Sequence, residues 1–165
     1  MESLARRVGS RSAQRREELA SANVYTPTMK SAPSKLRLNI LSDPATLAGT
    51  RLAVEALCAE NGLDKTSCDE VGLCVNEALA NVMRHAYHGA TDRPIELAAD
   101  ASDGAVRIAI RDWGDGVNPL DRPLPPPNPL RPGGLGLVCM RQMMDELSFH
   151  PQRDGMLLEM TKRKK

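Results

Sequence analysis

Hydrophobic and polar residues along this chain follow two periods, which predict two kinds of secondary structure. Alternation with a period of two, or a short apolar stretch beside a turn, predicts five strands, at residues 35–41, 94–99, 105–111, 147–150 and 156–160. Apolar residues that recur every three or four positions predict three helices, at residues 44–60, about 64–85 and 137–147. Helices thus lie in clusters between paired strands. We therefore expect an α+β fold, a two-layer α/β sandwich in which helices cover a mixed, mostly antiparallel sheet.

Other parts of the chain lack these periods. Residues 1–34 are polar and basic and offer little for a core to bury, so we expect a poorly ordered arm. Its arginines could contact an acidic partner or simply be solvated. We expect residues 35–162 to form one domain, followed by a basic tail, Lys162–Lys165. Residues 118–132 hold seven of the twelve prolines, which predicts a stiff, extended loop.

Composition argues against several classes of function. The net charge is +1 and aromatic residues make up 2% of the chain, which gives no argument for nucleic acid and no platform for stacking its bases. No apolar segment approaches the roughly 20 residues of a membrane-spanning helix. The four cysteines show no metal-binding spacing, so we expect buried free thiols in a reducing cytoplasm: Cys58, Cys68, Cys74 and Cys139.

Three polar residues interrupt the apolar pattern of the central helix. Glu77, Asn81 and His85 are spaced four residues apart, which places a carboxylate, an amide and an imidazole along one side. Such a stripe is expected where a polar ligand lies against the helix. Mg²⁺, with its water and phosphate ligands, is one candidate. A polar helix face turned to water would have the same spacing.

Two segments that contain glycine follow this helix. Residues 112–116 (DWGDG) end a predicted strand, where the carboxylate can accept a hydrogen bond from an exocyclic amine and the glycines let a flat ligand approach. Residues 133–136 (GGLG) open a predicted helix, where free N–H groups and the helix dipole favour phosphate. The alternatives are an ordinary turn for the first segment and a glycine hinge for the second. The second segment matches neither the P-loop nor the Rossmann pattern, and the proline-rich loop between them could act as a lid.

In this order and spacing the three segments resemble the N, G1 and G2 boxes of the GHKL superfamily of ATPases. Residues 76–87 (NEALANVMRHAY) and 133–147 (GGLGLVCMRQMMDEL) are most similar to the small anti-sigma-factor serine/threonine protein kinases. The resemblance covers residues 35–162. It implies the Bergerat fold, which is the histidine-kinase-like ATPase fold, with ATP and Mg²⁺ as cofactors.

The resemblance also implies roles for individual residues. Glu77 corresponds to the general base that takes the proton of an attacking hydroxyl, and Asn81 corresponds to the Mg²⁺ ligand. Asp112 corresponds to the carboxylate that binds the adenine amine. The remaining positions are expected beside the phosphates, around the purine or in the backbone that closes over the phosphates: Arg84, His85, Gly114, Gly116, Gly134 and Gly136.

The function that the resemblance implies is that of an anti-sigma regulatory factor in the cytoplasm. Such a protein is a serine/threonine protein kinase that phosphorylates an anti-anti-sigma partner with a STAS domain. A sigma factor is its other partner, and a homodimer is a further expectation. Two alternatives stay open: a nucleotide-gated module that sequesters its partner without phosphoryl transfer, and a detached histidine-kinase catalytic domain. The sequence departs from the family in its short, proline-rich G1–G2 segment and in residues 1–34, which have no counterpart in the minimal domain.

Overall fold

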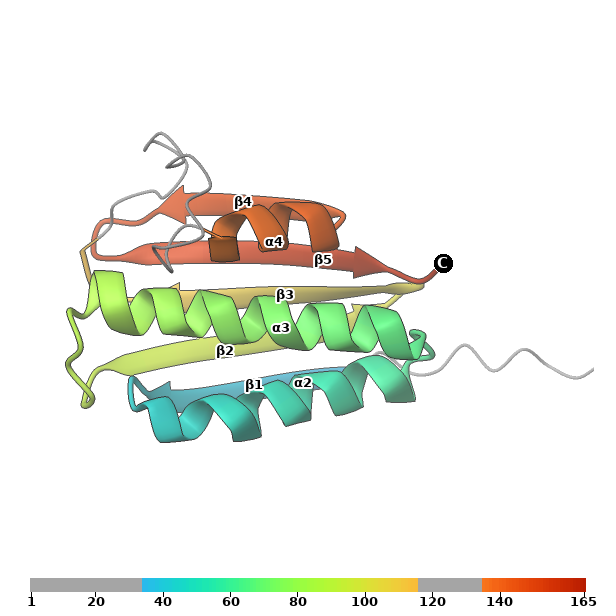
Figure 1. Cartoon of the computed structure of the whole chain (residues 1–165), viewed down its shortest axis with the longest axis horizontal. Helices are drawn as coiled ribbons and strands as arrows, with labels where there is room; N and C mark the ends of the chain where they lie inside the picture. The colour runs from blue at the N-terminus through green and yellow to red at the C-terminus, as the bar shows by residue number, and fades with distance from the viewer. Residues whose placement is uncertain (1–33, 116–134) are drawn as a thin grey trace, which may run out of the picture. The chain divides into compact units, whose positions relative to one another are not determined.

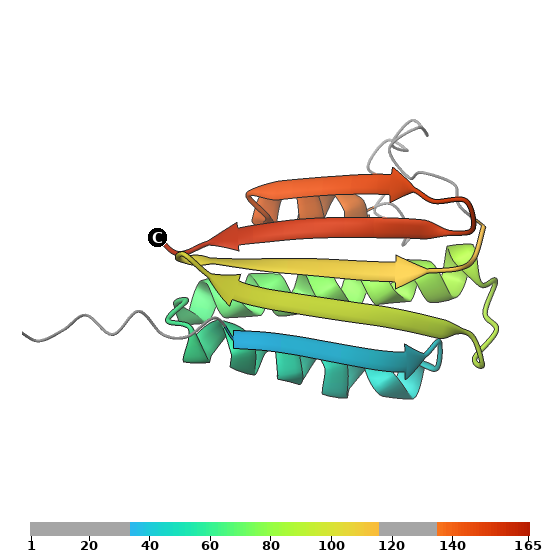
Figure 2. The ribbon, with the colours of Figure 1, turned by 180° about the vertical axis from the view of Figure 1, so that it is seen from behind.

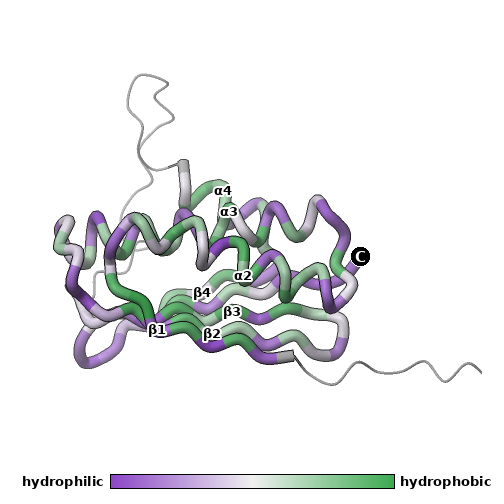
Figure 3. Tube along the Cα trace, turned by 90° about the horizontal axis from the view of Figure 1, so that it is seen from below, coloured by the Kyte–Doolittle hydropathy of each residue, from purple (hydrophilic) through white to green (hydrophobic). Residues whose placement is uncertain are grey.

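The computed structural model of the chain describes residues 34–115 and 135–165. Our expectations for the basic arm, except at Ser34, and for the proline-rich loop concern residues outside these ranges. Within them, helices and strands form two layers, which are seen edge-on in Figure 3. The helices cover one face of the sheet (Figure 1), and the view from behind shows that no described helix covers the other face, which we call the open face (Figure 2). The predicted α+β two-layer fold is confirmed.

The sheet has five strands in the order β1-β2-β3-β5-β4, and every neighbouring pair is antiparallel. The strands are β1 (Ser34–Leu41), β2 (Pro94–Ser102), β3 (Ala105–Asp112), β4 (Glu146–Pro151) and β5 (Met156–Arg163). Successive side chains alternate between the two faces. Leu97 and Ile108 are therefore buried under the helices, whereas Glu96 and Arg107 are exposed on the open face.

Among the described residues, the helical layer contains three α-helices, α2 (Leu47–Glu60), α3 (Lys65–Asn81) and α4 (Leu135–Met143). Two short turns flank them, the 3-10 turn η1 (Pro44–Thr46) and the π-helical turn η2 (Val82–Ala86). Side-chain caps mark the beginning of η1 and of α3. Asp43 accepts the N–H of Ala45 at 2.9 Å, and Asp64 accepts the N–H of Ser67 at 2.9 Å. None of the described helices is both long and apolar enough to cross a membrane.

The hydrophobic core lies between the two layers. Its large fully buried side chains come from both: Val54, Cys58, Val71, Val75, Leu79, Ile95, Leu97, Val106, Ile108, Ile110, Met140 and Met160. Cys58, Cys68 and Cys74 are buried as free thiols, as the sequence predicts, and Cys139 is half-buried. Burial raises the pKa of Cys58 and of Cys74 to about 12, so both thiols keep their protons at neutral pH.

Helix α4 ends earlier than the sequence predicts. The helix expected over 137–147 is wrong beyond Met143, because residues 146–151 form β4, with Leu147 opposite Met160. The change begins at Asp145, whose N–H donates to the carbonyl of Thr161 at 2.9 Å. Pairing with a distant strand therefore determines the structure of residues 146–151, although their local apolar spacing favours a helix. That spacing depends only on residues close in sequence, so it does not indicate a contact with a distant strand.

The predicted basic tail is wrong at its first residues. Lys162 belongs to β5 and is only 5% exposed. Its Nζ donates to Glu70 Oε2 on α3 at 2.5 Å and to the carbonyl of Met143 at 2.6 Å. A buried lysine needs such partners, and both come from elements remote in the sequence. Lys162 therefore fastens the end of α4 to α3 and to the sheet.

Replacing Lys162 with methionine is expected to lower the free energy of unfolding by about 2 kcal/mol and the melting temperature by about 8 °C. The change keeps the length of the side chain but removes the cation that pairs with Glu70 and the donor to Met143. Glu70 is partly exposed and regains water, so the loss stays below that of a fully buried pair. Thermal unfolding followed by circular dichroism measures the change.

Lys35 provides the matched control for this substitution. Its ion pair with Asp100 is exposed on the open face of the sheet. Lys35→Met is therefore expected to cost less than about 0.5 kcal/mol. Equal losses at the two positions would contradict the structural role of Lys162.

Candidate functional site

Four of the predicted site residues lie at the C-terminal end of α3 and on η2: Glu77, Asn81, Arg84 and His85. Glu77 and Asn81 are about one helical turn apart and half-buried. The helix then widens, because the N–H of Tyr87 donates to the carbonyl of Val82, five residues back, at 3.0 Å. The four-residue spacing that predicts a stripe as far as His85 therefore meets a π turn after Asn81. His85 lies on that turn and is exposed.

Arg84 connects the two predicted residues of α3. Its Nε donates to the carbonyl of Ala80 at 3.2 Å, and its Nη2 donates to Asn81 Oδ1 at 3.3 Å. The same Nη2 lies 4.0 Å from Glu77 Oε2. Because the guanidinium is more than half exposed, water screens its attraction to the carboxylate. A carboxylate, an amide and a guanidinium thus form one polar group at this end of the helix.

The first turn of α4 lies against Glu77. A Cβ atom added at Gly136 would lie 2.5 Å from Glu77 Oε2, so the lack of a side chain at Gly136 allows this close approach. The N-terminal end of α4, where N–H groups are free and the helix dipole is positive, is therefore next to the carboxylate. The fold brings together two segments that β2 and β3 separate in the sequence.

Asp112 is the last paired residue of β3, opposite Ile95 of β2 and Met156 of β5. Its side chain is 4% exposed, and Oδ1 accepts the N–H of Gly114 at 3.0 Å. Burial raises the pKa of this carboxyl group, and the hydrogen bond from Gly114 partly offsets the rise. A carboxylate has about four acceptor positions, so it can also accept a hydrogen bond from a ligand.

The chain that follows β3 lies against the end of the helix that carries Glu77 and Asn81. A side chain at Gly114 would collide with the carbonyl of Ala86, and the N–H of Asp115 donates to that same carbonyl at 3.2 Å. The two predicted parts of the site are therefore in contact, because η2 continues directly from α3.

Seven of the nine predicted residues lie in the described ranges. Glu77, Asn81 and Arg84 form one group, with Gly136 against Glu77. Asp112 and Gly114 form a second group at the end of β3, and His85 is exposed on η2 between them in the sequence. The two other residues, Gly116 and Gly134, lie outside the described residues. The individual roles of all nine stay predictions.

Sequence reasoning missed three residues that shape the second group. Tyr87 and Ala86 contact the chain after β3, and Tyr87 had a signal, since it is one of two tyrosines in a chain with 2% aromatic residues. Gly155, in the turn before β5, has a φ of +90° and lies so close to Asp112 that a side chain would collide with its carbonyl. A glycine in a turn is too common for the sequence to indicate this contact.

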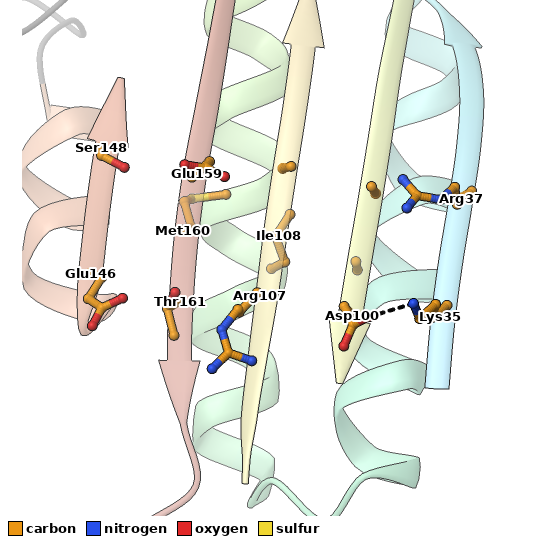
Figure 4. A pocket seen from close by; sticks show the side chains of 13 residues that line it. Lys35, Arg37, Asp100, Arg107, Ile108, Glu146, Ser148, Glu159, Met160 and Thr161 are labelled. Carbon is orange, nitrogen blue, oxygen red and sulfur yellow. Dashed lines mark ion pairs between the residues drawn. The ribbon is translucent and has the colours of Figure 1, made fainter. Parts of the chain in front are cut away.

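A hollow of about 310 Å³ lies elsewhere, on the open face of the sheet (Figure 4). The small side chains of Ala98 and Ala109, opposite each other on β2 and β3, leave space there among charged residues such as Arg37 and Glu159. None of the predicted site residues lines it. We place the candidate site at α3 and the end of β3, because the predicted residues within the described ranges gather there.

The described part of the chain contains no group of three His, Cys, Asp or Glu side chains placed to hold a metal ion. The oxygen atoms of Asn81 and Glu77 are nevertheless the type of donor that Mg²⁺ prefers. Mg²⁺ keeps several water ligands and is commonly bound through one or two protein groups together with phosphates. These residues therefore fit a metal that arrives with a nucleotide.

Known proteins resemble this chain in sequence and in fold. The family model for the histidine kinase-like ATPase domain matches residues 40–162. An anti-sigma F factor of Clostridium botulinum is 30% identical over 127 residues, which cover 73% of this chain and 87% of that protein. The serine-protein kinase RsbW of Bacillus velezensis is 23% identical over 142 residues, which cover 81% of this chain and 88% of that protein.

A solved structure supports the fold. The RsbU and RsbW domains of a Mycobacterium tuberculosis protein match with a TM-score of 0.57 and 21% identity, over 79% of this chain and 32% of that one. The family model begins near the end of β1 and covers β2 to β4, nearly all of β5, the three described α-helices and the contacts between α3, α4 and the end of β3. The chain therefore belongs to the family of histidine kinase-like ATPase domains, and anti-sigma factors and serine-protein kinases are among its relatives.

Proposed function

We propose that this protein binds ATP and acts as an anti-sigma regulatory factor with serine/threonine protein kinase activity. The observation that carries the proposal is the contact of Gly136 with Glu77, because it puts a carboxylate beside a helix end suited to phosphate. The relatives named anti-sigma F factor and serine-protein kinase support it. The proposed location is the cytoplasm, where ATP is available.

ATP would bind along α3, η2 and the end of β3. Asp112 would accept a hydrogen bond from the adenine amine, with Gly114 and Gly116 beside the purine. The residues assigned to the phosphate end are Asn81, Arg84, His85, Gly134 and Gly136. When bound, Mg²⁺ would neutralise phosphate charge and orient the γ-phosphoryl group, and Asn81 is the protein ligand that we assign to it.

Glu77 is the general base of the proposed reaction. It would take the proton of a serine or threonine hydroxyl as that oxygen attacks the γ-phosphorus of ATP. The bond between the γ-phosphorus and the bridging oxygen breaks, and ADP leaves with that oxygen. Arg84, with its Nη2 4.0 Å from Glu77 Oε2, supplies positive charge near the transferring group.

The proposed substrate is an anti-anti-sigma protein with a STAS domain, and a sigma factor is the second proposed partner. Transfer of label from γ-labelled ATP to a purified STAS-domain protein tests this reaction. A partner that binds only with nucleotide present and is never phosphorylated would favour sequestration without transfer. Light scattering of the purified chain tests the expected homodimer.

Calorimetric titration with ATP, with and without Mg²⁺, tests the nucleotide site. In the wild type, Mg²⁺ is expected to strengthen ATP binding about tenfold, and Asn81→Ala is expected to reduce this effect to less than about twofold. The reason is that the variant lacks the amide oxygen assigned to the metal. Asn39→Ala, at an exposed position of β1, is the matched control and should keep the full metal effect. Absence of ATP binding by the wild type would contradict the proposed function.

A further inference from the structure

The hydroxyl of Tyr87 joins the ends of two neighbouring strands. Tyr87 Oη donates to the carbonyl of Pro94, the first residue of β2, at 2.6 Å. It also accepts the N–H of Trp113, the first residue after β3, at 2.8 Å. The tyrosine is 8% exposed, and burial raises its pKa, so the hydroxyl keeps the proton that it donates.

This hydroxyl continues the β-sheet where backbone pairing stops. Asp112 is the last residue of β3 that pairs with β2 and with β5. The N–H of Trp113 therefore lies one residue past the sheet, and Tyr87 Oη provides its acceptor. Without that acceptor the N–H would lose its hydrogen bond in a partly buried place, which is unfavourable.

The π turn η2 positions Ala86 and Tyr87 to contact the residues that follow β3. Because the N–H of Tyr87 bonds to Val82, five residues back, the last turn of the helix is wider than an α turn. The carbonyl of Ala86 then accepts the N–H of Asp115, and the chain at Gly114 lies directly against it. Two consecutive residues of the helix end thus hold three consecutive residues after β3.

We propose that Tyr87 is a positioning residue for recognition of the adenine base, an inference that rests on the proposed function. Asp112 Oδ1 is bound to the N–H of Gly114 at 3.0 Å, so the direction of the carboxylate depends on where Gly114 lies. The position of Gly114 depends in turn on Ala86 beside it and on the Tyr87–Trp113 hydrogen bond before it. Tyr87 touches neither nucleotide nor metal in this scheme and acts through Asp112.

The test uses Tyr87→Phe in the full chain, which keeps the buried ring and removes only the hydroxyl. ATP binding is expected to weaken about tenfold, while binding of inorganic tripolyphosphate changes by less than about twofold. Calorimetry with each ligand measures the two affinities. Trp113 is the one tryptophan of the chain, so its fluorescence reports on this strand end alone, and its emission is expected to shift to longer wavelength.

Thr50→Val is the matched control, since it also removes one buried hydroxyl, which donates to the backbone carbonyl of Thr46, the last residue of η1. It is expected to leave both affinities and the Trp113 emission unchanged, even if the melting temperature falls. Equal weakening of ATP and tripolyphosphate in Tyr87→Phe, or no weakening of either, would overturn the positioning role. If the wild type binds neither ligand, the proposed function itself fails and the base recognition fails with it.

Discussion

A Glu77→Gln variant is expected to phosphorylate its protein substrate about 10²- to 10⁴-fold more slowly, while its affinity for ATP changes by less than about threefold. Glutamine has nearly the same shape and keeps the contact with Gly136, but it cannot accept the proton of the attacking hydroxyl. Because that proton moves only in the transfer step, the loss appears in kcat. Label transfer at saturating ATP and calorimetry measure the two quantities separately.

Glu60→Gln is the matched control, because Glu60 is exposed at the C-terminal end of α2. Its phosphorylation rate should equal that of the wild type. Undiminished transfer by Glu77→Gln would show that another group takes the proton. Loss of ATP binding in that variant would instead assign the carboxylate to the nucleotide.

Asp112→Asn is expected to weaken ATP binding by about 10- to 100-fold and to leave tripolyphosphate binding within about twofold. The asparagine amide fits the same buried space, but it has one oxygen where the carboxylate has two. In the wild type, one carboxylate oxygen accepts the N–H of Gly114, and the amide oxygen would take over that hydrogen bond. The amide nitrogen would then face the adenine amine, a donor against a donor. Competition between ATP and a fluorescent nucleotide measures the change.

The same substitution at Asp100 is the control for Asp112→Asn. Asp100 lines the hollow on the open face of the sheet, away from α3 and α4. Asp100→Asn is expected to bind ATP as the wild type does. If Asp112→Asn weakened ATP and tripolyphosphate alike, the carboxylate would be needed for the structure of the site and not for the base.

Much of the fold follows from local patterns in the sequence. The strand predicted at 105–111 is observed as Ala105–Asp112, and the helix predicted at about 64–85 is observed as α3 followed by η2. The turn between the strands predicted at 94–99 and 105–111 contains Asp103 (φ 53°) and Gly104 (φ 74°), and Asp-Gly is a residue pair typical of hairpin turns. These features depend on residues close in sequence, which is why the pattern alone predicts them.

Features that depend on distant residues escaped prediction. The end of α4 is set by pairing with β5, and the burial of Lys162 is set by Glu70, which lies on α3. The candidate site shows the same division. The residue types of Glu77 and Asp112 are visible as motifs, whereas the contact of Tyr87 with Trp113 appears only once β3 lies beside the helix end. Local sequence does not encode which side chain will meet a strand end.

The burial of the cysteines has a practical consequence. Cys58, Cys68 and Cys74 are enclosed in the core, which leaves Cys139 as the thiol that an alkylating reagent reaches first. Cys139 lies on α4, less than one turn after Gly136. A fluorophore attached there would follow the helix next to Glu77 in the natural sequence, with no cysteine added or removed. Dye labelling could thus follow this helix through each round of nucleotide binding and release.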